Sequence, residues 1–451
     1  MSSSTTPNIG SLLLPIDREQ VGEEMHSFIA DLFPICRSIT GEGIRETIGY
    51  IGRRIPLDVS EVPTGTPVLD WTVPREWNIR DAYVADATGK RVIDFRESNL
   101  HVMSYSVPFR GRLDLGSLRE HLHTLPEHPD LIPYRTSYYS ESWGFCLSQR
   151  QLEALTDGEY EVCVDTSLLE GHLTYAECYL PGASQDEILF SCHICHPSLA
   201  NDNLSGIVVS TFLAERLARV DRRYSYRFLF VPGTIGSLTW LARNESRLER
   251  IRHGLVLASV GDAATFTYKR SRHGDAEVDR AAEHVLRYAA PDHEVIDFSP
   301  YGYDERQYCS PGFDLPVGSL SRSRHGRFPE YHTSGDNLAF VHPAALGQSL
   351  AVTLGVVEVL EGNGTYRNLS PKGEPQLGRR GLYPSMGGRD AEAQQMALLW
   401  VLNQSDGRRS LLHIAERAGM PFADIRTAAN RLQEHGLLAP VEGTPDMARD
   451  L

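Results

Sequence analysis

The stretch Ser191-Cys-His-Ile-Cys-His-Pro-Ser-Leu-Ala-Asn-Asp-Asn-Leu-Ser-Gly206 decides the fold, because it sets metal-binding residue types between an apolar strand and a helix. The apolar run that begins at Glu187 is typical of a buried strand, and Leu204 to Val220 has the apolar spacing of a packed helix. Sites in open α/β sheets form at the carboxyl ends of strands, so His193 and Asp202 are candidate functional residues. The alternative is that His193 is a loop histidine and Asp202 only begins the helix.

Length and charge restrict the class of protein. The chain has 451 residues, which suggests about two to four domains. No apolar run approaches the roughly 20 residues that cross a bilayer, and the polar start of the chain lacks a secretory pattern, so we expect a cytoplasmic protein. The net charge of −15 argues against bulk attraction to nucleic acid or to anionic membranes.

The seven cysteines are odd in number and widely scattered, which predicts reduced thiols rather than a disulfide framework. Cys192 and Cys195 form a Cys-x-x-Cys, but His196-Pro197 follows it where a thioredoxin-type motif would open a helix. No second pair is present to build a structural zinc site. We therefore expect both thiols to be unpaired wall residues.

Further apolar runs alternate with helical patterns after the opening stretch. They are Arg227 to Val231, Leu255 to Ala258 and Pro316 to Leu320. This alternation predicts an α/β fold with a mostly parallel sheet and helices on both faces. We assign residues 17–60 and 155–362 to this domain.

Residues 61–154 interrupt this pattern with short alternating apolar runs separated by proline and glycine, which predicts an inserted β-rich lid domain. Tyr134, Arg135, Tyr138 and Trp143 combine a cation with aromatic faces, so we expect them to face the cleft and bind substrate. The alternative is that the aromatic run is simply part of a core.

The tail divides into a linker, 363–388, rich in proline, glycine and charge, and a C-terminal domain, 389–451. Three helical patterns and a final apolar run in the latter look like a small winged helix. Acidic residues dilute Arg426 and Arg431, so a nucleic-acid partner is less expected than a protein partner, a homo-oligomer contact or a structural role.

Four longer strings carry a resemblance to a known family. Two short motifs of this chain, Ala200 to Gly206 and Tyr331 to Asp336, resemble motifs of the zinc aminopeptidase superfamily. More closely, the chain looks like a bacterial aminopeptidase-like family found near polysaccharide and natural-product genes, whose members carry an inserted β domain and a C-terminal winged helix. The strings are His193 to Gly206, Pro232-Gly-Thr-Ile-Gly-Ser237, Tyr303-Asp-Glu-Arg-Gln-Tyr-Cys-Ser-Pro-Gly312 and Pro329-Glu-Tyr-His-Thr-Ser334.

The resemblance implies metal ligands at His193, Asp202 and His332. Where the superfamily has two consecutive glutamates, one a general base and the other a ligand, this chain has Pro232-Gly-Thr-Ile235. Ser259 stands where a fourth carboxylate is expected, and Asp262 follows three residues later. Because too few carboxylates remain for two metals, we expect a single Zn²⁺ with one position open for water.

The run Asp304-Glu-Arg-Gln307 supplies further candidates. We expect Glu305 to be the general base, although a solvated loop carboxylate is the alternative. Asp304 would orient a ligand histidine, and Arg306 would hold a substrate carboxylate.

The predicted function is therefore a zinc-dependent aminopeptidase-like hydrolase of a peptide or amide bond in a small molecule, in polysaccharide or natural-product biosynthesis. Two alternatives stay open. One is a catalytically inactive, peptidase-derived binding or scaffold protein, and the other is a DNA-binding regulator that acts through the winged helix.

Overall fold

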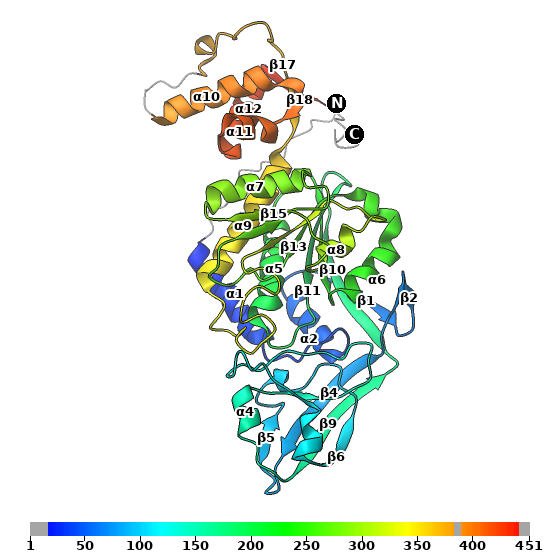
Figure 1. Cartoon of the computed structure of the whole chain (residues 1–451). Helices are drawn as coiled ribbons and strands as arrows, with labels where there is room; N and C mark the ends of the chain where they lie inside the picture. Colours follow the sequence, from blue (N-terminus) through cyan, green and yellow to red (C-terminus); the bar gives the residue numbers. More distant parts are fainter. Residues whose placement is uncertain (1–16, 383–388, 442–451) are drawn as a thin grey trace.

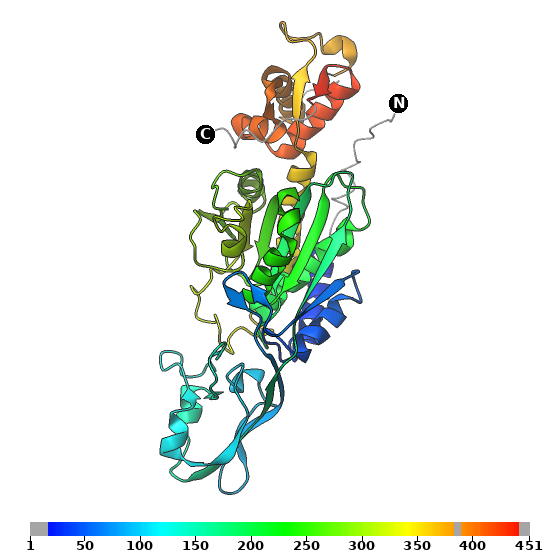
Figure 2. The ribbon, with the colours of Figure 1, turned by 90° about the vertical axis from the view of Figure 1, so that its right-hand side faces the viewer.

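The structure is a computed structural model that describes residues 17–382 and 389–441. The last part of the predicted linker, 383–388, and the end of the predicted C-terminal domain, 442–451, lie outside the described residues. The described chain forms three parts in a row, with the α/β part in the middle, the inserted segment at one end and the C-terminal part at the other (Figure 1, Figure 2).

An eight-stranded sheet forms the middle part, in the order β1-β10-β12-β11-β13-β16-β14-β15. The four central strands are parallel to one another, and β1, β10 and β14 each run antiparallel to a neighbour. Parallel strands end at a common edge, so β11, β12, β13 and β16 deliver their following loops to one place. The strands are β1 (Asp58–Pro63), β10 (His172–Leu180), β11 (Glu187–His193), β12 (Ser225–Val231), β13 (Ile251–Leu257), β14 (Thr267–Lys269), β15 (Glu294–Ile296) and β16 (Val317–Ser321).

Helices cover both faces of this sheet, as expected for an α/β fold (Figure 1). On one face α1 (Arg18–Leu32), α5 (Gly206–Leu217) and α7 (Glu277–Ala289) pack against α9 (Pro343–Gly362). On the other face α6 (Ile235–Asn244) packs against the short α8 (Glu305–Tyr308). Helix α2 (Glu42–Ile51) packs on β10 from the first face, where Arg54, just after α2, pairs with Glu215 of α5. The predicted fold class is confirmed, with a sheet that is parallel at its centre and mixed at its edges.

Helix α9 is long and apolar enough to cross a membrane by length and composition alone, with a mean hydropathy of 1.5. Two-thirds of that stretch, 67%, is buried inside the structure, where α9 packs against α1, α5, α7 and α12 (Phe422–Glu434). A core helix passes the same test, and the packing of α9 is that of a core helix.

The inserted segment has its own sheet, in the order β5-β4-β9-β6, and its own apolar core around Phe145 and Val162. The prediction ended the insertion at residue 154, but β9 pairs with β4 and β6 as far as Leu169, so the smaller sheet continues beyond that point. Its elements are β2 (Pro67–Val68), β3 (Trp71–Thr72), β4 (Glu76–Ala85), β5 (Arg91–Asp94), β6 (Phe109–Asp114), α3 (Leu115–Arg119), β7 (Leu122–His123), β8 (Phe145–Cys146), α4 (Gln149–Glu153) and β9 (Glu159–Leu169).

The C-terminal part contains three helices and a three-stranded sheet in the order β18-β17-β19. The prediction placed residues 363–388 in a linker, but β17 is the central strand of this sheet, so the fold begins earlier than predicted. Helix α11 begins where Ser410 Oγ accepts the His413 N–H and ends at Gly419, whose φ of 62° favours glycine. The elements are β17 (Thr365–Asn368), α10 (Arg389–Gln404), β18 (Asp406–Ser410), α11 (Leu411–Ala418), α12 (Phe422–Glu434) and β19 (Leu438–Pro440).

Candidate metal centre

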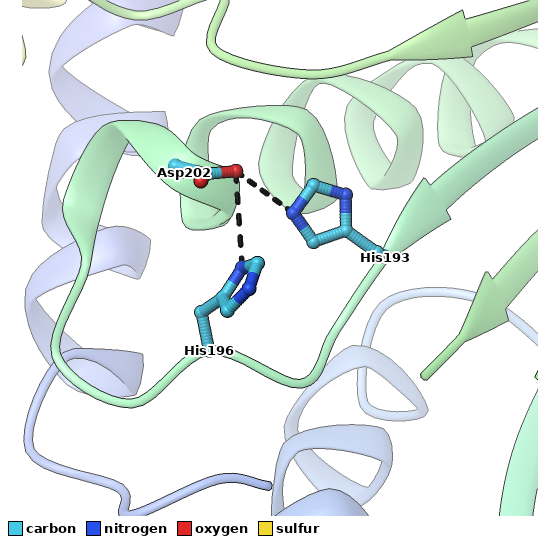
Figure 3. A group of neighbouring side chains, drawn as sticks. All are labelled: His193, His196 and Asp202. Carbon is cyan, nitrogen blue, oxygen red and sulfur yellow. Dashed lines mark hydrogen bonds and ion pairs between the residues drawn. The ribbon is translucent and has the colours of Figure 1, made fainter. Parts of the chain in front are cut away.

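The loop after β11 brings two histidines and an aspartate together (Figure 3). His193 is the last residue of β11, and Asp202 lies in the wide turn Ala200–Ser205 that precedes α5. His193 Nε2 lies 2.8 Å from Asp202 Oδ1, and His196 Nδ1 lies 3.8 Å from the same oxygen. The candidate ligand atoms of these three residues all lie within 4.8 Å of one another.

His332 adds a third imidazole from a distant part of the chain. Its Nε2 lies 3.2 Å from Asp202 Oδ2. The backbone of His332 has a φ of 54°, a left-handed conformation that residues with a side chain rarely adopt. The Tyr134 N–H, which belongs to the inserted segment, donates to the His332 carbonyl at 2.7 Å and helps to hold this conformation. The result is one carboxylate surrounded by three imidazoles.

Three of the inward-facing atoms are buried and make no hydrogen bond of good geometry within the described part of the chain, although two of them, Asp202 Oδ2 and His332 Nε2, contact each other at 3.2 Å. They are His196 Nδ1, Asp202 Oδ2 and His332 Nε2. A buried polar atom without a partner costs about 1–3 kcal/mol, so such atoms indicate a missing partner when they gather in one place. Imidazole nitrogen and carboxylate oxygen are ligands that Zn²⁺ prefers, so the residues present fit a zinc ion.

A second carboxylate, that of Asp336, holds the turn that carries Asp202. Asp336 accepts the backbone N–H of Asn201 at 2.6 Å and of Asp202 at 2.8 Å. Burial raises the pKa of Asp336 to about 8, and the two N–H groups oppose this rise. Asn203 also holds the turn, because its Nδ2 donates to the Leu257 carbonyl at 3.0 Å. Asp202 is therefore placed by its neighbours and does not cap α5, which was the alternative role for this residue.

Burial and the neighbouring charges shift the pKa values of the residues in the centre in opposite directions. Burial alone would raise the pKa of Asp202, but His196 and His193 lower it well below its usual range. Burial lowers the pKa of His196 well below 6.5, a trend that Asp202 opposes. A carboxylate beside a neutral imidazole is the protonation state that binds a metal ion, because ligands must be deprotonated.

Asp304 lines the cavity beside this centre. Its Oδ1 accepts a hydrogen bond from Ser237 Oγ at 2.9 Å, and its Oδ2 is buried without a partner. Burial raises the pKa of Asp304. We predicted that this carboxylate orients a ligand histidine, but the hydrogen bond goes to Ser237 instead.

The position of Gly233 explains how Asp304 reaches the centre. A Cβ atom added at Gly233 would lie 3.0 Å from the Cβ of His193 and 3.4 Å from Asp304 Oδ2. A side chain at residue 233 would therefore point into the space beside His193 that Asp304 borders. This turn lacks the consecutive glutamates of the superfamily. The carboxylate of Asp304, at the start of α8, lies beside the turn instead.

Glu305, the predicted general base, does not line the cavity, whereas Asp304, which is equally buried, does. Glu305 Oε1 accepts a hydrogen bond from Lys269 Nζ at 2.7 Å. Asp304 and Glu305 are consecutive residues at the start of α8, and consecutive helical side chains point about 100° apart. Of the two, Asp304 is the residue that lines the cavity.

The cavity has a volume of about 500 Å³ and is lined by the three histidines and Asp304. Of the predicted substrate residues, Tyr138 and Arg306 line it. Tyr134 is buried behind them, with its ring centroid 5.2 Å from that of His196 and 5.1 Å from that of His332.

Two predicted substrate residues lie elsewhere. Arg135 is exposed and does not line the cavity. Trp143 stacks between Phe109 and His121, with ring centroids at 4.2 Å and 3.7 Å, in the core of the inserted segment. Trp143 belongs to a core, which was the alternative for this aromatic run, whereas Arg135 lies at the surface.

Sequence reasoning missed His196 and several aromatic residues. The spacing His193-x-x-His196 was available as a signal, but the loop contains no regular element that would tell which way its side chains point. Trp71, Tyr139 and Tyr301 also line the cavity; Tyr139 belongs to the aromatic run that was singled out, but it was not among the residues chosen. The prediction for the thiols is confirmed, since Cys192 and Cys195 are both free and buried.

Comparison with known proteins gives consistent findings. A family model described as a domain of unknown function, DUF4910, matches residues 26–363, and a winged helix-turn-helix model matches residues 364–440. A Clostridium acetobutylicum protein, provisionally named a polysaccharide biosynthesis protein with an aminopeptidase-like domain, is 52% identical over 420 residues, which cover 93% of this chain and 96% of that protein.

Solved structures show the same relationship. A crystal structure of a provisionally named peptidase from Clostridium acetobutylicum has a TM-score of 0.91 at 50% identity and covers 94% of this chain and 98% of its own. A zinc aminopeptidase from Bacillus subtilis has a TM-score of 0.56 at 13% identity, covering 74% of this chain and 94% of its own. At that identity the second likeness concerns the fold alone.

Proposed function

Because this chain belongs to the family that the DUF4910 model describes, and because it has the fold of zinc aminopeptidases, we propose that it is a hydrolase of amide bonds that uses a single zinc ion. One observation carries the proposal. His193, His196 and Asp202 bring candidate ligand atoms within 4.8 Å of one another, and His332 Nε2 lies 3.2 Å from the second oxygen of Asp202, beside a cavity that the three histidines line.

The residue inventory supports one ion rather than two. A centre for two ions needs more carboxylates, and Asp202 is the carboxylate among the four residues. The nearby Asp262 is bound instead to the Asn201 amide at 2.7 Å. A zinc ion held by these residues would polarise an amide carbonyl and lower the pKa of a bound water.

Asp304 supplies the proton transfer that amide hydrolysis needs. Its free Oδ2 borders the cavity, where it accepts a proton from water and passes it to the leaving amine nitrogen. Ser237 holds the other oxygen, so the carboxylate keeps one orientation during this transfer. The aromatic ring of Tyr134 packs against two of the histidines and keeps bulk water from that side.

The metal content of the purified full-length chain tests the proposal. We expect about one zinc per chain after removal of loose metal and titration with Zn²⁺. His196→Ala and His332→Ala should each weaken zinc affinity by at least about 10-fold to 100-fold, the range seen when even an outer partner of a ligand is lost. His435→Ala is the matched control, because His435 is exposed at the end of α12.

Two results would overturn the proposal. Two tightly bound zinc ions per chain, or none, would contradict a single-ion centre. Zinc binding without turnover of a panel of aminoacyl and N-acyl p-nitroanilides would favour the inactive binding protein, an alternative that the missing carboxylates at Gly233 and Thr234 support.

The printed name of the Clostridium relative refers to polysaccharide biosynthesis, and we extend that setting to this chain as part of the proposal. A cytoplasmic site of action also stays a prediction. The seven free cysteines are compatible with it, because reducing compartments keep thiols unpaired.

A further inference from the structure

Exposed aromatic side chains gather around the cavity that contains the candidate centre. In the described part of the chain, four aromatic residues count among the large exposed apolar side chains: Trp71, Tyr139, Tyr288 and Tyr301. Three of these four, all except Tyr288, line this one cavity. Exposed aromatic rings are costly to leave in water, and their concentration at one opening marks a binding surface.

The rings are arranged as two pairs that come from different parts of the chain. Trp71 and Tyr139 of the inserted segment have ring centroids 5.5 Å apart. Tyr301 stacks on His325 with centroids 5.0 Å apart, and both belong to the α/β domain. Flat faces from two sides suit a flat ligand with apolar C–H faces, and a pyranose ring has such faces.

The charges of the cavity wall restrict the ligand further. Among the described residues that line it, Arg306 is the sole arginine or lysine and Asp304 the sole carboxylate. The Nε of Arg306 is buried without a hydrogen-bond partner. A guanidinium in this state is suited to a carboxylate or phosphate group, which it can bind through two parallel hydrogen bonds.

The same inventory disfavours a free amino terminus. An ammonium group beside the scissile amide would need a carboxylate partner, and Asp304 already has the proton-transfer role. Burial lowers the pKa of His325 to about 4, so its ring adds an uncharged face near neutral pH. The cavity therefore offers no free carboxylate that could pair with the α-amino group of a peptide substrate.

We propose that the substrate is an N-acylated amino sugar that bears an anionic group, such as a sugar phosphate, and that the reaction is its deacylation. This inference rests on the proposed function, since it names the substrate class of that site. Water adds to the acyl carbon, the C–N bond breaks, and a carboxylic acid and an amino sugar leave. The proton from water moves through Asp304 Oδ2 to the amine nitrogen.

Binding measurements on the full-length, zinc-supplied chain test the inference without requiring turnover. The probes are N-acetylglucosamine 1-phosphate, N-acetylglucosamine, glucosamine 1-phosphate and inorganic phosphate, each titrated by calorimetry. We expect the first probe to bind about 10-fold or more tightly than each of the others, because it alone has ring, acyl group and anion together.

Matched variants separate the contributions of charge and rings. Arg306→Ala should abolish the advantage of N-acetylglucosamine 1-phosphate over N-acetylglucosamine, and Arg247→Ala, an exposed arginine on another surface, should not. Trp71→Ala should weaken both acetylated sugars by about 3-fold to 10-fold. Tyr288→Ala is its control, because Tyr288 is an exposed ring outside the cavity.

Several outcomes would overturn the inference. They are equal binding of inorganic phosphate and the acetylated sugar phosphate, binding of that sugar phosphate that Arg306→Ala leaves unchanged, and tighter binding of glucosamine 1-phosphate. Hydrolysis of leucine p-nitroanilide without binding of the sugar phosphate would overturn it while the proposed hydrolase stands. Selective binding by a chain that hydrolyses no amide, the acetylated sugar phosphate included, would instead overturn the proposed hydrolase and the deacylation step.

Discussion

Asp304 and Glu305 are neighbours in the chain, yet their carboxylates have opposite surroundings. Each has one buried oxygen without a hydrogen-bond partner, but Asp304 lines the cavity, whereas Glu305 does not line it and is paired with Lys269. Lys269 Nζ also donates to the Tyr301 carbonyl at 2.9 Å. This bond connects the Lys269–Glu305 ion pair to the loop that carries Tyr301, one of the aromatic residues that line the cavity. The two residues should therefore respond differently to loss of charge.

Asp304→Asn should lower kcat by about 10²-fold to 10⁴-fold while zinc content is unchanged, because the group that moves the proton is lost. Glu305→Gln should mainly reduce stability, since a buried ammonium that loses its partner costs about 3–5 kcal/mol. Turnover of the chromogenic amide panel, zinc analysis and urea unfolding measure the three quantities on the same preparations.

A double variant provides the control for this pair. Lys269→Met together with Glu305→Leu removes both charges and should recover most of the lost stability, because a buried ion pair contributes little beyond its apolar replacement. Full activity of Asp304→Asn would reject Asp304 as the base. A kcat loss in stable, zinc-loaded Glu305→Gln equal to that of Asp304→Asn would return the role to Glu305.

At the residue scale, the sequence predicted the identity of candidate ligands better than the direction of side chains. His193, Asp202 and His332 follow from extended strings, and the structure brings them together. His196 lies three residues after His193, and Asp304, which was chosen for a different role, lies next to Glu305. In each case the two residues differ in the face of a loop or of a single helical turn that they occupy. Tertiary packing sets that direction, and no local pattern encodes it.

At the scale of elements, one imidazole joins the C-terminal part to the α/β domain. His284 Nε2 on α7 accepts the backbone N–H of Phe422, the first residue of α12, at 3.0 Å. Arg280 of α7 also forms an ion pair with Glu416 of α11. Burial lowers the pKa of His284, with Glu416 opposing and Arg287 supporting the shift. A neutral ring is required, because a protonated Nε2 could not accept the Phe422 N–H.

This contact predicts a pH dependence of stability. The folded pKa of His284 lies below the unfolded value of about 6.5, so its contribution is complete above that pH and is lost as the pH falls through the folded pKa. His284→Gln keeps an acceptor that does not titrate, so its free energy of unfolding should fall less than that of the wild type between about pH 8 and about pH 5. Urea unfolding over this range measures the difference.

The comparison for this experiment is His435→Gln, which removes an exposed imidazole from the other end of α12. Its pH dependence should match the wild type. Identical slopes for His284→Gln and the wild type would show that the contact does not contribute to stability.

Elements with a strong local pattern were predicted within a few residues. The predicted helix Leu204 to Val220 contains α5, and the apolar run Arg227 to Val231 lies within β12. Boundaries between parts were less predictable. Strand β9 belongs to the insertion and β17 to the C-terminal sheet because of partners that lie far away in the sequence. Long-range pairing of this kind leaves no signal in a local window.

At the scale of the whole molecule, the C-terminal part is poorly placed to bind DNA. In a DNA-binding helix-turn-helix motif, the N-terminus of the second helix usually contacts base edges. Here that helix is α12, and its first residue is hydrogen-bonded to His284 of the α/β domain. Arg426 donates to the Tyr366 hydroxyl at 2.8 Å, and Arg431 donates to the Leu382 carbonyl at 3.3 Å. The net charge of −15 repels a polyanion in addition.

We therefore expect no measurable binding of a duplex of about 20 base pairs at about 50 mM salt, with a Kd weaker than about 10⁻⁴ M. Fluorescence anisotropy of a labelled duplex measures this, and Arg426→Ala should change nothing. A Kd in the micromolar range that weakens steeply with salt would revive the DNA-binding regulator.

The contact between Tyr134 and His332 also has a consequence in time. The backbone of residues 132–134 is bonded to that of 332–334, and the Ile132 N–H reaches Ser334 Oγ across 202 residues of sequence. At about 5 to 20 residues per second, a ribosome releases the first segment about 10 to 40 seconds before the second. His193, His196 and Asp202 emerge within that interval, with the third imidazole still unmade. The centre and the wall of its cavity are thus completed together, as one of the last events in the synthesis of the α/β domain.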